Sequence, residues 1–219
     1  MDIIKSYIGK PVDIELSGDK IHSGILIDSG PDILVLKGKY HFFYIPLLHV
    51  QFIKPKLLED DQISYSSSSN HLQLEENISY RKILTNAKGM FVEIFVTGNQ
   101  SLHGYITSIL TNYFVFNSPI FKTLYIPLQH LKWLIPYQEN QTPFSLKSYQ
   151  IYSSDIPLLR TFEELLKKIE GRIVVFDLGL HPNKTGLLKK VENNFAELIT
   201  GNENSIHCNI QHIKTVHCP

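Results

Sequence analysis

The stretch GKPVDIELSGDKIHSGIL, residues 9–26, decides the fold because its pattern returns twice more along the chain. It returns as GMFVEIFVTGNQSLHGYI at 89–106 and as GRIVVFDLGLHPNKTGLL at 171–188. Two glycines stand fifteen residues apart in each copy, namely Gly9 and Gly24, Gly89 and Gly104, and Gly171 and Gly186. A histidine before an apolar residue ends each copy, at His49, His130 and His212. Because such recurrence reports a repeated structural unit, we expect three small modules.

Each copy begins with a strand pattern. Val12, Ile14 and Leu16 alternate with acidic residues, which is typical of a strand with one buried face. After a turn the chain returns through the second glycine, which in a strand usually marks a bulge or bend. Third strands are expected at 33–36, 113–116 and 195–199, fourth strands at 42–45, 124–126 and 206–208, and fifth strands ending at 53, 135 and 216. Five short, strongly bent strands predict a small barrel.

A short helix is expected before each barrel. The clearest spans 158–169, where Leu158, Phe162, Leu165 and Ile169 share one face and Gly171 ends the helix. Weaker copies lie at 3–8 and 78–84. The predicted fold is therefore mainly β, with three tandem five-stranded barrels that each follow a short helix.

The repeats also predict the domain boundaries. We expect modules at 1–54, 77–136 and 158–219, separated by a Ser-rich linker at 55–76 and a second linker at 137–157. Each module is near the lower size limit for independent folding, because small domains bury proportionately little surface. We therefore expect the modules to pack on one another or on other chains.

Charge and composition limit the partners. Lys+Arg and Asp+Glu both number 21, so the formal net charge is zero and no basic run is present. Nucleic-acid binding draws much of its affinity from basic side chains on phosphates, so a nucleic-acid partner is not expected. Near-zero charge also removes a barrier to self-association. No secretory signal or membrane-spanning apolar run is present, which predicts a soluble protein made in the cytoplasm.

Histidines and cysteines are the residues that suggest chemistry. His49, His130 and His212 recur at one position, which favours a structural hydrogen bond to backbone over a ligand role. His207, Cys208, His212, His217 and Cys218 form the one cluster with metal-binding chemistry, but their spacing does not match a zinc site. Cys208 and Cys218 remain candidate cross-linking thiols, although a buried Cys208 and an idle Cys218 are favoured. We expect no metal, cofactor or catalytic residue, and hence no enzyme.

Aromatic residues are plentiful and have two interpretations. In the core they would fill the small barrels, and on the surface they would be interface anchors or base-stacking platforms. The core interpretation is favoured overall. Tyr44, Tyr125 and Trp133 are the interface candidates, the two tyrosines because each precedes Ile-Pro-Leu.

The helix-plus-five-strand pattern resembles the Sm-like (SH3-like) barrel. The repeats are more similar to the spore coat protein B family, in which a Gly-x-L turn leads to a strand and an x-x-H-[VI]-K-x-I ending. The matching stretches are SGIL at 23–26 with LHVQFI at 48–53, HGYI at 103–106 with QHLK at 129–132, and TGLL at 185–188 with QHIKTV at 211–216. The family's GGPE turn is replaced here by SGDK, TGNQ and GLHP. Because the sequence stops at Pro219, we expect a shorter paralogue without the family's Ser/Lys-rich tail.

This resemblance implies a structural protein of the bacterial spore coat or exosporium, synthesised in the mother-cell cytoplasm. Such a protein would act by self-association and by assembly with other spore coat proteins. The alternative is an Sm-like RNA-binding protein, against which the zero net charge counts. A barrel left open at an edge would favour strand-to-strand association.

Overall fold

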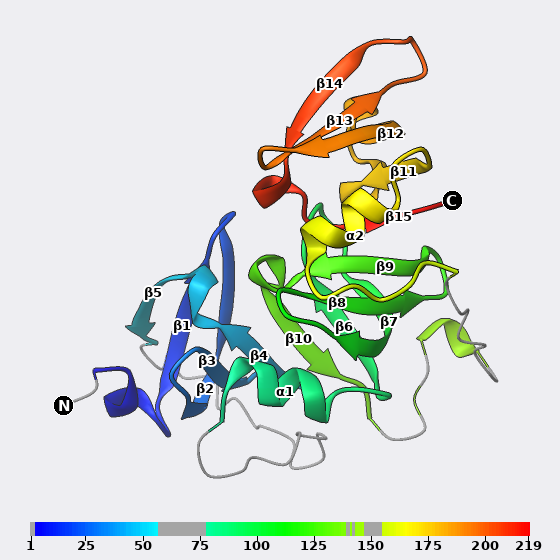
Figure 1. The fold of residues 1–219 in the computed structure, drawn as a ribbon. Helices are drawn as coiled ribbons and strands as arrows, with labels where there is room; N and C mark the ends of the chain where they lie inside the picture. Colours follow the sequence, from blue (N-terminus) through cyan, green and yellow to red (C-terminus); the bar gives the residue numbers. More distant parts are fainter. Residues whose placement is uncertain (1–2, 57–77, 139–140, 142, 147–154) are drawn as a thin grey trace. The chain divides into compact units, whose positions relative to one another are not determined.

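The computed structural model describes residues 3–56, 78–138, 141, 143–146 and 155–219 (Figure 1). Within these ranges the chain is mainly β, as predicted, with fifteen strands and two short α-helices. The chain divides into two compact units, the first comprising Met1–Phe95 with Lys132–Ser145 and the second Val96–Leu131 with Leu146–Pro219. The second repeat therefore contributes strands to both units.

The first unit holds seven strands in the order β6-β10-β4-β3-β2-β1-β5. The first repeat supplies β1 (Pro11–Leu16), β2 (Lys20–Ser29), β3 (Ile33–Lys37), β4 (Phe42–Pro46) and β5 (Val50–Pro55), and the second supplies β6 (Phe91–Phe95) and β10 (Trp133–Pro136). The 3-10 helix η1 (Ile4–Tyr7) precedes β1, and helix α1 (Tyr80–Asn86) precedes β6. The strand pairs formed by β1 to β5 are antiparallel.

The second unit holds eight strands in the order β14-β13-β12-β11-β15-β9-β8-β7. The second repeat supplies β7 (Leu102–Ile109), β8 (Tyr113–Ser118) and β9 (Lys122–Pro127). The third repeat supplies helix α2 (Phe162–Lys168), β11 (Ile173–Phe176), β12 (Thr185–Glu192), β13 (Phe195–Ile199), β14 (Ser205–Asn209) and β15 (Val216–His217). One turn of 3-10 helix joins the fourth to the fifth strand of each repeat, as η2 (Leu47–His49), η3 (Leu128–His130) and η7 (Ile210–His212).

The expectation of self-contained barrels needs correction. In the first repeat β5 pairs back onto β1, but β4 pairs with β10 of the second repeat. In the third repeat β15 pairs with β11 on one side and with β9 of the second repeat on the other. The hydrogen-bonding groups that would close a barrel are thus used between repeats, and the ladders described here do not close.

The first glycine of each repeat has a conformational reason. The backbone φ angles are all positive, at 78°, 79° and 81° for Gly9, Gly89 and Gly171. This left-handed conformation is strained for residues with a Cβ atom. It ends the short helix and redirects the chain into the first strand.

The second glycine has a steric reason. A Cβ atom at Gly104 would lie 2.0 Å from the carbonyl oxygen of Asn117 on the neighbouring strand. At Gly24 and Gly186 the corresponding distances to a carbonyl oxygen are 2.3 Å and 2.4 Å. The bend itself comes a few residues later, where β2, β7 and β12 each show a register shift typical of a β-bulge.

Helix α2 is shorter than the predicted 158–169 because a capping box fixes its first turn. The Glu164 backbone N–H donates to Thr161 Oγ1 at 3.3 Å, and the Thr161 N–H donates to Glu164 Oε2 at 3.0 Å. This reciprocal pair makes Thr161 the N-cap and leaves Leu158 outside the helix. Ser79 caps α1 through the Lys82 N–H, whereas η1 has no side-chain cap.

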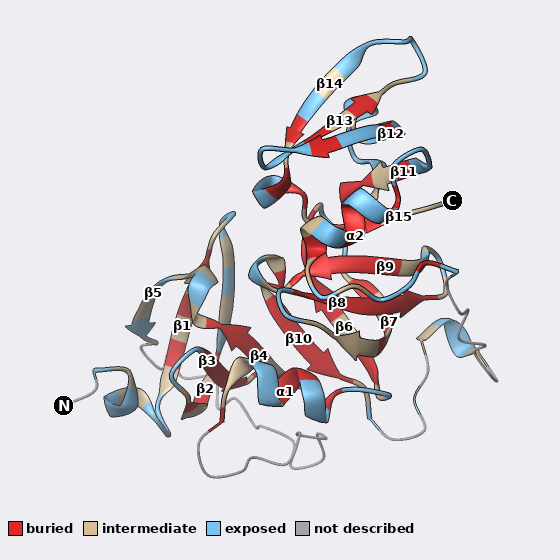
Figure 2. Cartoon of the chain, viewed as in Figure 1, coloured by how far each residue is buried: buried red, intermediate tan, exposed pale blue. Residues whose placement is uncertain are grey.

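The hydrophobic cores do not follow the repeat boundaries, and Figure 2 shows buried residues on strands of all three repeats. In the first unit one cluster joins Val12, Ile14 and Leu36 of the first repeat to Phe95 and Trp133 of the second. In the second unit another cluster joins side chains of β8 and β9 to those of α2 and of β11 to β15. Each junction between repeats is thus part of a hydrophobic core. The junctions therefore contribute to stability, because burial of apolar area is the main stabilising term in folding.

Candidate functional site at the junctions between repeats

Two strand pairings join the repeats, and they are equivalent. In the first junction Tyr44 on β4 lies opposite Leu134 on β10. In the second junction Tyr125 on β9 lies opposite Val216 on β15. In both, the residue five before a repeat's histidine faces the residue four after the next repeat's histidine. The fourth strand of one repeat therefore binds the fifth strand of the next in a fixed register.

The aromatic interface candidates lie inside these junctions. Tyr44, Tyr125 and Trp133 are all buried, as are Leu134 and Val216 on the opposing strands. Each contacts a neighbouring repeat of the same chain. Their burial accounts for aromatic residues at positions where the sequence alone left core and interface open.

A second contact recurs at both junctions and involves the helices. The Tyr80 N–H, at the start of α1, donates to Asp32 Oδ1 at 2.8 Å. The Phe162 N–H, at the start of α2, donates to Asn112 Oδ1, also at 2.8 Å. Asp32 and Asn112 occupy the same position, immediately before the third strand of their repeats. The first and second repeats thus each supply an acceptor for an N–H group at the helix start of the next repeat.

An aromatic cluster fills the first junction. The indole of Trp133 stacks on Phe95 with ring centroids 4.2 Å apart, and the His22 ring lies 4.5 Å from both Trp133 and Phe43. Burial, and then the nearby charge of Lys20, lowers the pKa of His22 to about 4. The His22 side chain is therefore neutral near pH 7 and packs as an aromatic ring.

The second junction carries a different set of contacts. Gln129 Nε2 donates to the carbonyl oxygen of Gln211 at 3.0 Å, which links the two 3-10 turns η3 and η7. The Tyr113 hydroxyl donates to the Leu159 carbonyl oxygen at 2.7 Å. His217 packs edge-on against Phe121, and burial lowers its pKa. These contacts hold the side chains of Gln129, Tyr113 and His217 against the neighbouring repeat.

The three recurring histidines stand at the 3-10 turns. His49 Nδ1 lies 3.2 Å from the Ser17 hydroxyl, and the His49 carbonyl oxygen accepts the Ser17 N–H at 2.9 Å. His130 lies beside Gln129, with its Nε2 3.4 Å from the amide nitrogen. His212 is exposed. The strand connection at His49 thus uses its backbone oxygen, while its ring contacts a hydroxyl group.

Asp177 is a site residue that the sequence pattern missed. Strand alternation predicts a solvated face for it, but β11 ends at Phe176 and the Asp177 carboxylate turns inward and is buried. It accepts the backbone N–H groups of Lys214 and Thr215 at 2.6 and 3.3 Å and forms an ion pair with Lys184 at 3.1 Å. The signal available in the sequence is Gly179, which stands where the other two repeats have Ser17 and Thr97.

The C-terminal histidines and cysteines are not assembled into a metal centre. Among the residues that the structure describes, no group of three or more His, Cys, Asp or Glu side chains could hold a metal ion. Cys208 is buried and Cys218 half-buried, and both thiols are free. Burial raises the pKa of both thiols, which disfavours the reactive thiolate.

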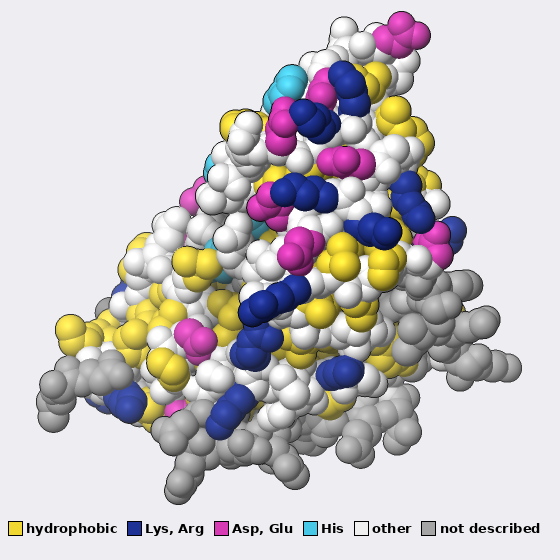
Figure 3. All heavy atoms as spheres, in the orientation of Figure 1, with side chains coloured by type: hydrophobic (Ala, Val, Ile, Leu, Met, Phe, Trp, Pro, Cys, Tyr) yellow, Lys and Arg dark blue, Asp and Glu magenta, His cyan; other side chains and the backbone are white. Residues whose placement is uncertain are grey.

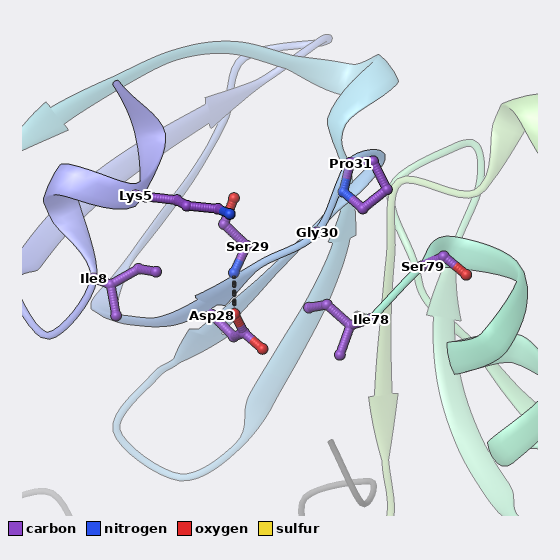
Figure 4. Close-up of a pocket in the computed structure, with 8 residues that line it drawn as sticks. All are labelled: Lys5, Ile8, Asp28, Ser29, Gly30, Pro31, Ile78 and Ser79. Carbon is purple, nitrogen blue, oxygen red and sulfur yellow. Dashed lines mark hydrogen bonds between the residues drawn. The ribbon is translucent and has the colours of Figure 1, made fainter. Parts of the chain in front are cut away.

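A surface hollow of about 600 Å³ lies in the first unit (Figure 4). Lys5, Ile8, Asp28 and Ile78 are among its lining residues. The Asp28 carboxylate already accepts the Ser29 N–H at 2.7 Å, drawn as the dashed line. The eight described lining residues hold one lysine and one carboxylate with no nucleophile and base in contact, so we assign the hollow no chemistry.

Comparisons with known proteins match two parts of the chain to family models and the whole chain to a relative. The YwrJ third domain matches residues 161–216, and a domain of unknown function, DUF2642, matches residues 1–55. The uncharacterized protein YwrJ of Bacillus subtilis (strain 168) is 40% identical over 222 residues, covering 99% of both chains. The chain belongs to the YwrJ family.

The YwrJ family in turn has a more distant relative. Spore coat protein B of Bacillus subtilis (strain 168) is 25% identical over 139 residues, which cover 64% of this chain and 35% of that protein. The resemblance to spore coat protein B is therefore confirmed as a partial and distant similarity. No helix among the described residues is long and apolar enough to cross a membrane.

Proposed function

We propose that this chain is a non-enzymatic structural protein of the bacterial spore coat or exosporium, which acts by assembling with other coat proteins. The observation that carries the proposal is the junction formed twice between a fourth strand and the fifth strand of the next repeat. A chain that joins its own repeats through strand edges is suited to join further proteins in the same way. The distant similarity to spore coat protein B supports the location.

In this proposal each repeat is an Sm-like module. The first repeat has the strand order β5-β1-β2-β3-β4, and the third has the matching order β15-β11-β12-β13-β14. A helix or helical turn precedes each first strand, and a bulge bends each second strand. These common features support an open five-stranded module whose edges are completed by neighbours.

A structural role also fits the positions of the perturbed groups. His22 and His217 have lowered pKa values, but both rings pack against aromatic side chains at a junction. Tyr113, with its pKa raised to about 12 mainly by burial, donates its hydroxyl to a backbone carbonyl. Catalytic groups are usually tuned toward neutral pH in a cleft, whereas these groups are held in contacts between repeats.

The charge pattern of the second unit supports assembly over RNA binding. Lys167, Lys189 and Lys190 each form an ion pair with a glutamate, and Arg172 pairs with Asp155. Figure 3 shows basic and acidic side chains interspersed over the visible face. Binding to a phosphate backbone needs basic side chains grouped without such acidic neighbours.

Fractionation of spores tests the location. The full-length chain, carrying a small epitope tag, would be produced in sporulating Bacillus cells, with the same tag on an unrelated cytoplasmic protein as control. We expect the chain in the coat and exosporium extracts of purified spores and the control in the mother-cell lysate. Recovery of both proteins in the soluble mother-cell fraction would contradict the proposal.

Binding to single-stranded RNA tests the alternative. Fluorescence anisotropy with a labelled RNA would be measured from about 20 to 200 mM salt, the range over which phosphate contacts weaken steeply. We expect no saturable binding at micromolar protein concentration. A tight complex that weakens steeply with salt would favour the Sm-like RNA-binding protein instead.

A further inference from the structure

In the part of the chain that the structure describes, two strand edges are left open when the in-chain junctions have formed. Among the described residues, β5 pairs with β1 alone and β14 pairs with β13 alone. These are the fifth strand of the first repeat and the fourth strand of the third repeat. They are the same two kinds of strand that pair at each junction inside the chain.

The exposure of β5 differs from that of the paired fifth strands (Figure 2). All four residues of β10 are buried, whereas all six residues of β5 are exposed or only partly buried. Phe52 is 42% exposed, while Trp133, at the equivalent position three residues after the histidine, is 6% exposed. The difference is the one expected for an apolar strand whose partner is absent.

The exposure of β14 differs in the same sense from that of the paired fourth strands. Tyr44 and Tyr125 are buried at their junctions, whereas His207, at the equivalent position of β14, is exposed. Unpaired edges of this kind expose N–H and C=O groups and form ready templates for another chain. Neither edge carries a proline at the central position, so both retain the groups needed for a ladder.

The geometry points to head-to-tail association of the chain with a second copy, in which β14 of one molecule pairs with β5 of the next. The register of the two in-chain junctions carries over directly. His207, five before the third histidine, would lie opposite Ile53, four after the first histidine. This inference rests on the assembly role proposed above and names a second copy of the chain as the partner. Sedimentation measures association in solution and spore fractionation measures location, so the two proposals can fail separately.

A second contact would recur at the same junction. Gln129 donates to the Gln211 carbonyl at the second junction, one position before the histidine in each repeat. Gln211 itself stands at the Gln129 position of the third repeat and is exposed. In the pairing between copies its amide would meet the carbonyl of Leu48, whose side chain is 71% exposed.

One contact of the in-chain junctions is not made at η1 within a single chain. Helices α1 and α2 begin on an Asx side chain of the preceding repeat, but η1 is a 3-10 helix with no side-chain cap. The third repeat keeps an Asx residue at this position, since Asn194 immediately precedes β13 as Asp32 and Asn112 precede their third strands. Because two separate chains must meet at this junction, we expect association that depends on concentration, at micromolar levels and above.

Sedimentation of the full-length protein from about 1 to 200 μM tests the inference. We expect the wild-type chain to form dimers or longer assemblies, since a head-to-tail contact gives closed rings or open chains. Ile53→Asp and His207→Asp each place a charge at the centre of one edge, and each should lower association at least tenfold. Because Ile53 also packs against the core of the first unit, circular dichroism verifies that each variant is folded. Ile21→Asp is the matched control, because Ile21 is 57% exposed on β2 and lies away from both edges.

Mixing the two edge variants separates a head-to-tail contact from a symmetric one. The Ile53→Asp chain keeps an intact β14 and the His207→Asp chain keeps an intact β5, so an equimolar mixture should form a dimer that neither variant forms alone. A wild-type chain that stays monomeric at the highest concentration would overturn the inference. So would an equimolar mixture that stays monomeric, or an Ile21→Asp chain that loses association as much as the edge variants do.

Discussion

Tyr125 on β9 lies directly opposite Val216 on β15, and this pair joins the second repeat to the third. Tyr44 and Leu134 form the matching pair between the first two repeats. The same register at two junctions means that the repeat encodes both a module and the way in which one module binds the next. Equivalent residues of each repeat therefore form both the strands of the repeat and the pairing with the next repeat.

The second glycine of each repeat should tolerate a side chain poorly, because a carbonyl oxygen of the neighbouring strand occupies the place of its Cβ atom. Gly104→Ala places a methyl group 2.0 Å from the Asn117 carbonyl oxygen and should lower the free energy of unfolding by about 3 kcal/mol. Gly9→Ala meets no atom within 4 Å but has a positive φ, so its cost should be about 1 kcal/mol. Urea denaturation measures both, with Gly201→Ala as control. Equal losses for Gly104 and Gly201 would contradict the steric explanation.

The hydrogen bonds that Asp32 and Asn112 accept at the helix starts should stabilise the folded chain about as much as ordinary N-terminal caps do. Asn112→Ala removes the acceptor for the Phe162 N–H and should lower the free energy of unfolding by about 1 kcal/mol. Asn112→Asp keeps the acceptor and should restore the wild-type value within a few tenths of that amount. Chemical denaturation followed by far-UV circular dichroism compares the three chains. If the Asp variant is as unstable as the Ala variant, the side-chain oxygen has no such role.

His22 should make the first junction sensitive to acid. Its pKa is about 4 in the folded chain and near 6.5 when unfolded, so the unfolded chain binds more protons between these values. The free energy of unfolding should therefore fall as the pH drops from 6.5 to 4, by about 1–2 kcal/mol for this partly solvated ring. His22→Leu, which copies Leu102 of the second repeat, should flatten this part of the profile. Identical pH profiles for the two chains would show that His22 does not carry the effect.

The buried carboxylate of Asp177 should stabilise the turn that replaces the strand end in the third repeat. Asp177→Ala leaves the N–H groups of Lys214 and Thr215 without their acceptor and should cost about 2–3 kcal/mol. Glu192→Ala breaks only an exposed ion pair with Lys190 and should cost less than about 1 kcal/mol. Thermal unfolding at neutral pH ranks the two variants. A smaller loss for Asp177→Ala than for Glu192→Ala would show that the turn does not depend on the carboxylate.

The strands were predictable because they depend on local patterns. Alternation at Val12, Ile14 and Leu16 and the spacing of Gly9 and Gly24 are properties of one repeat, and the structure shows strands at these positions. The pairing of β4 with β10 was not predictable, because it joins strands that belong to different repeats and lie far apart in the chain. Nothing local distinguishes a fourth strand that closes its own barrel from one that binds the next repeat.

The candidate site was predicted in part for the same reason. Tyr44 and Tyr125 stood out by their recurrence, but their burial depends on strands supplied by another repeat. His22 and Asp177 gave no sequence signal by recurrence, since each differs from the residues at the equivalent positions in the other repeats. The Thr161-x-x-Glu164 capping box was a readable signal and would have placed the start of α2 correctly.

Disulfide trapping between two copies tests most directly the claim that the in-chain register continues between chains. Chains with Cys208→Ala and Cys218→Ala would carry either Ile53→Cys or His207→Cys, and would be mixed under mild oxidation. Opposed residues in an antiparallel pair have Cβ atoms about 5 Å apart, whereas a shift of two residues gives about 7–8 Å. We predict rapid cross-linking between the thiols introduced at positions 53 and 207 only in the mixture, and much slower cross-linking when Ser205→Cys, two residues away on β14, replaces His207→Cys. Equal rates for both pairs, or no cross-link in either mixture, would contradict the account.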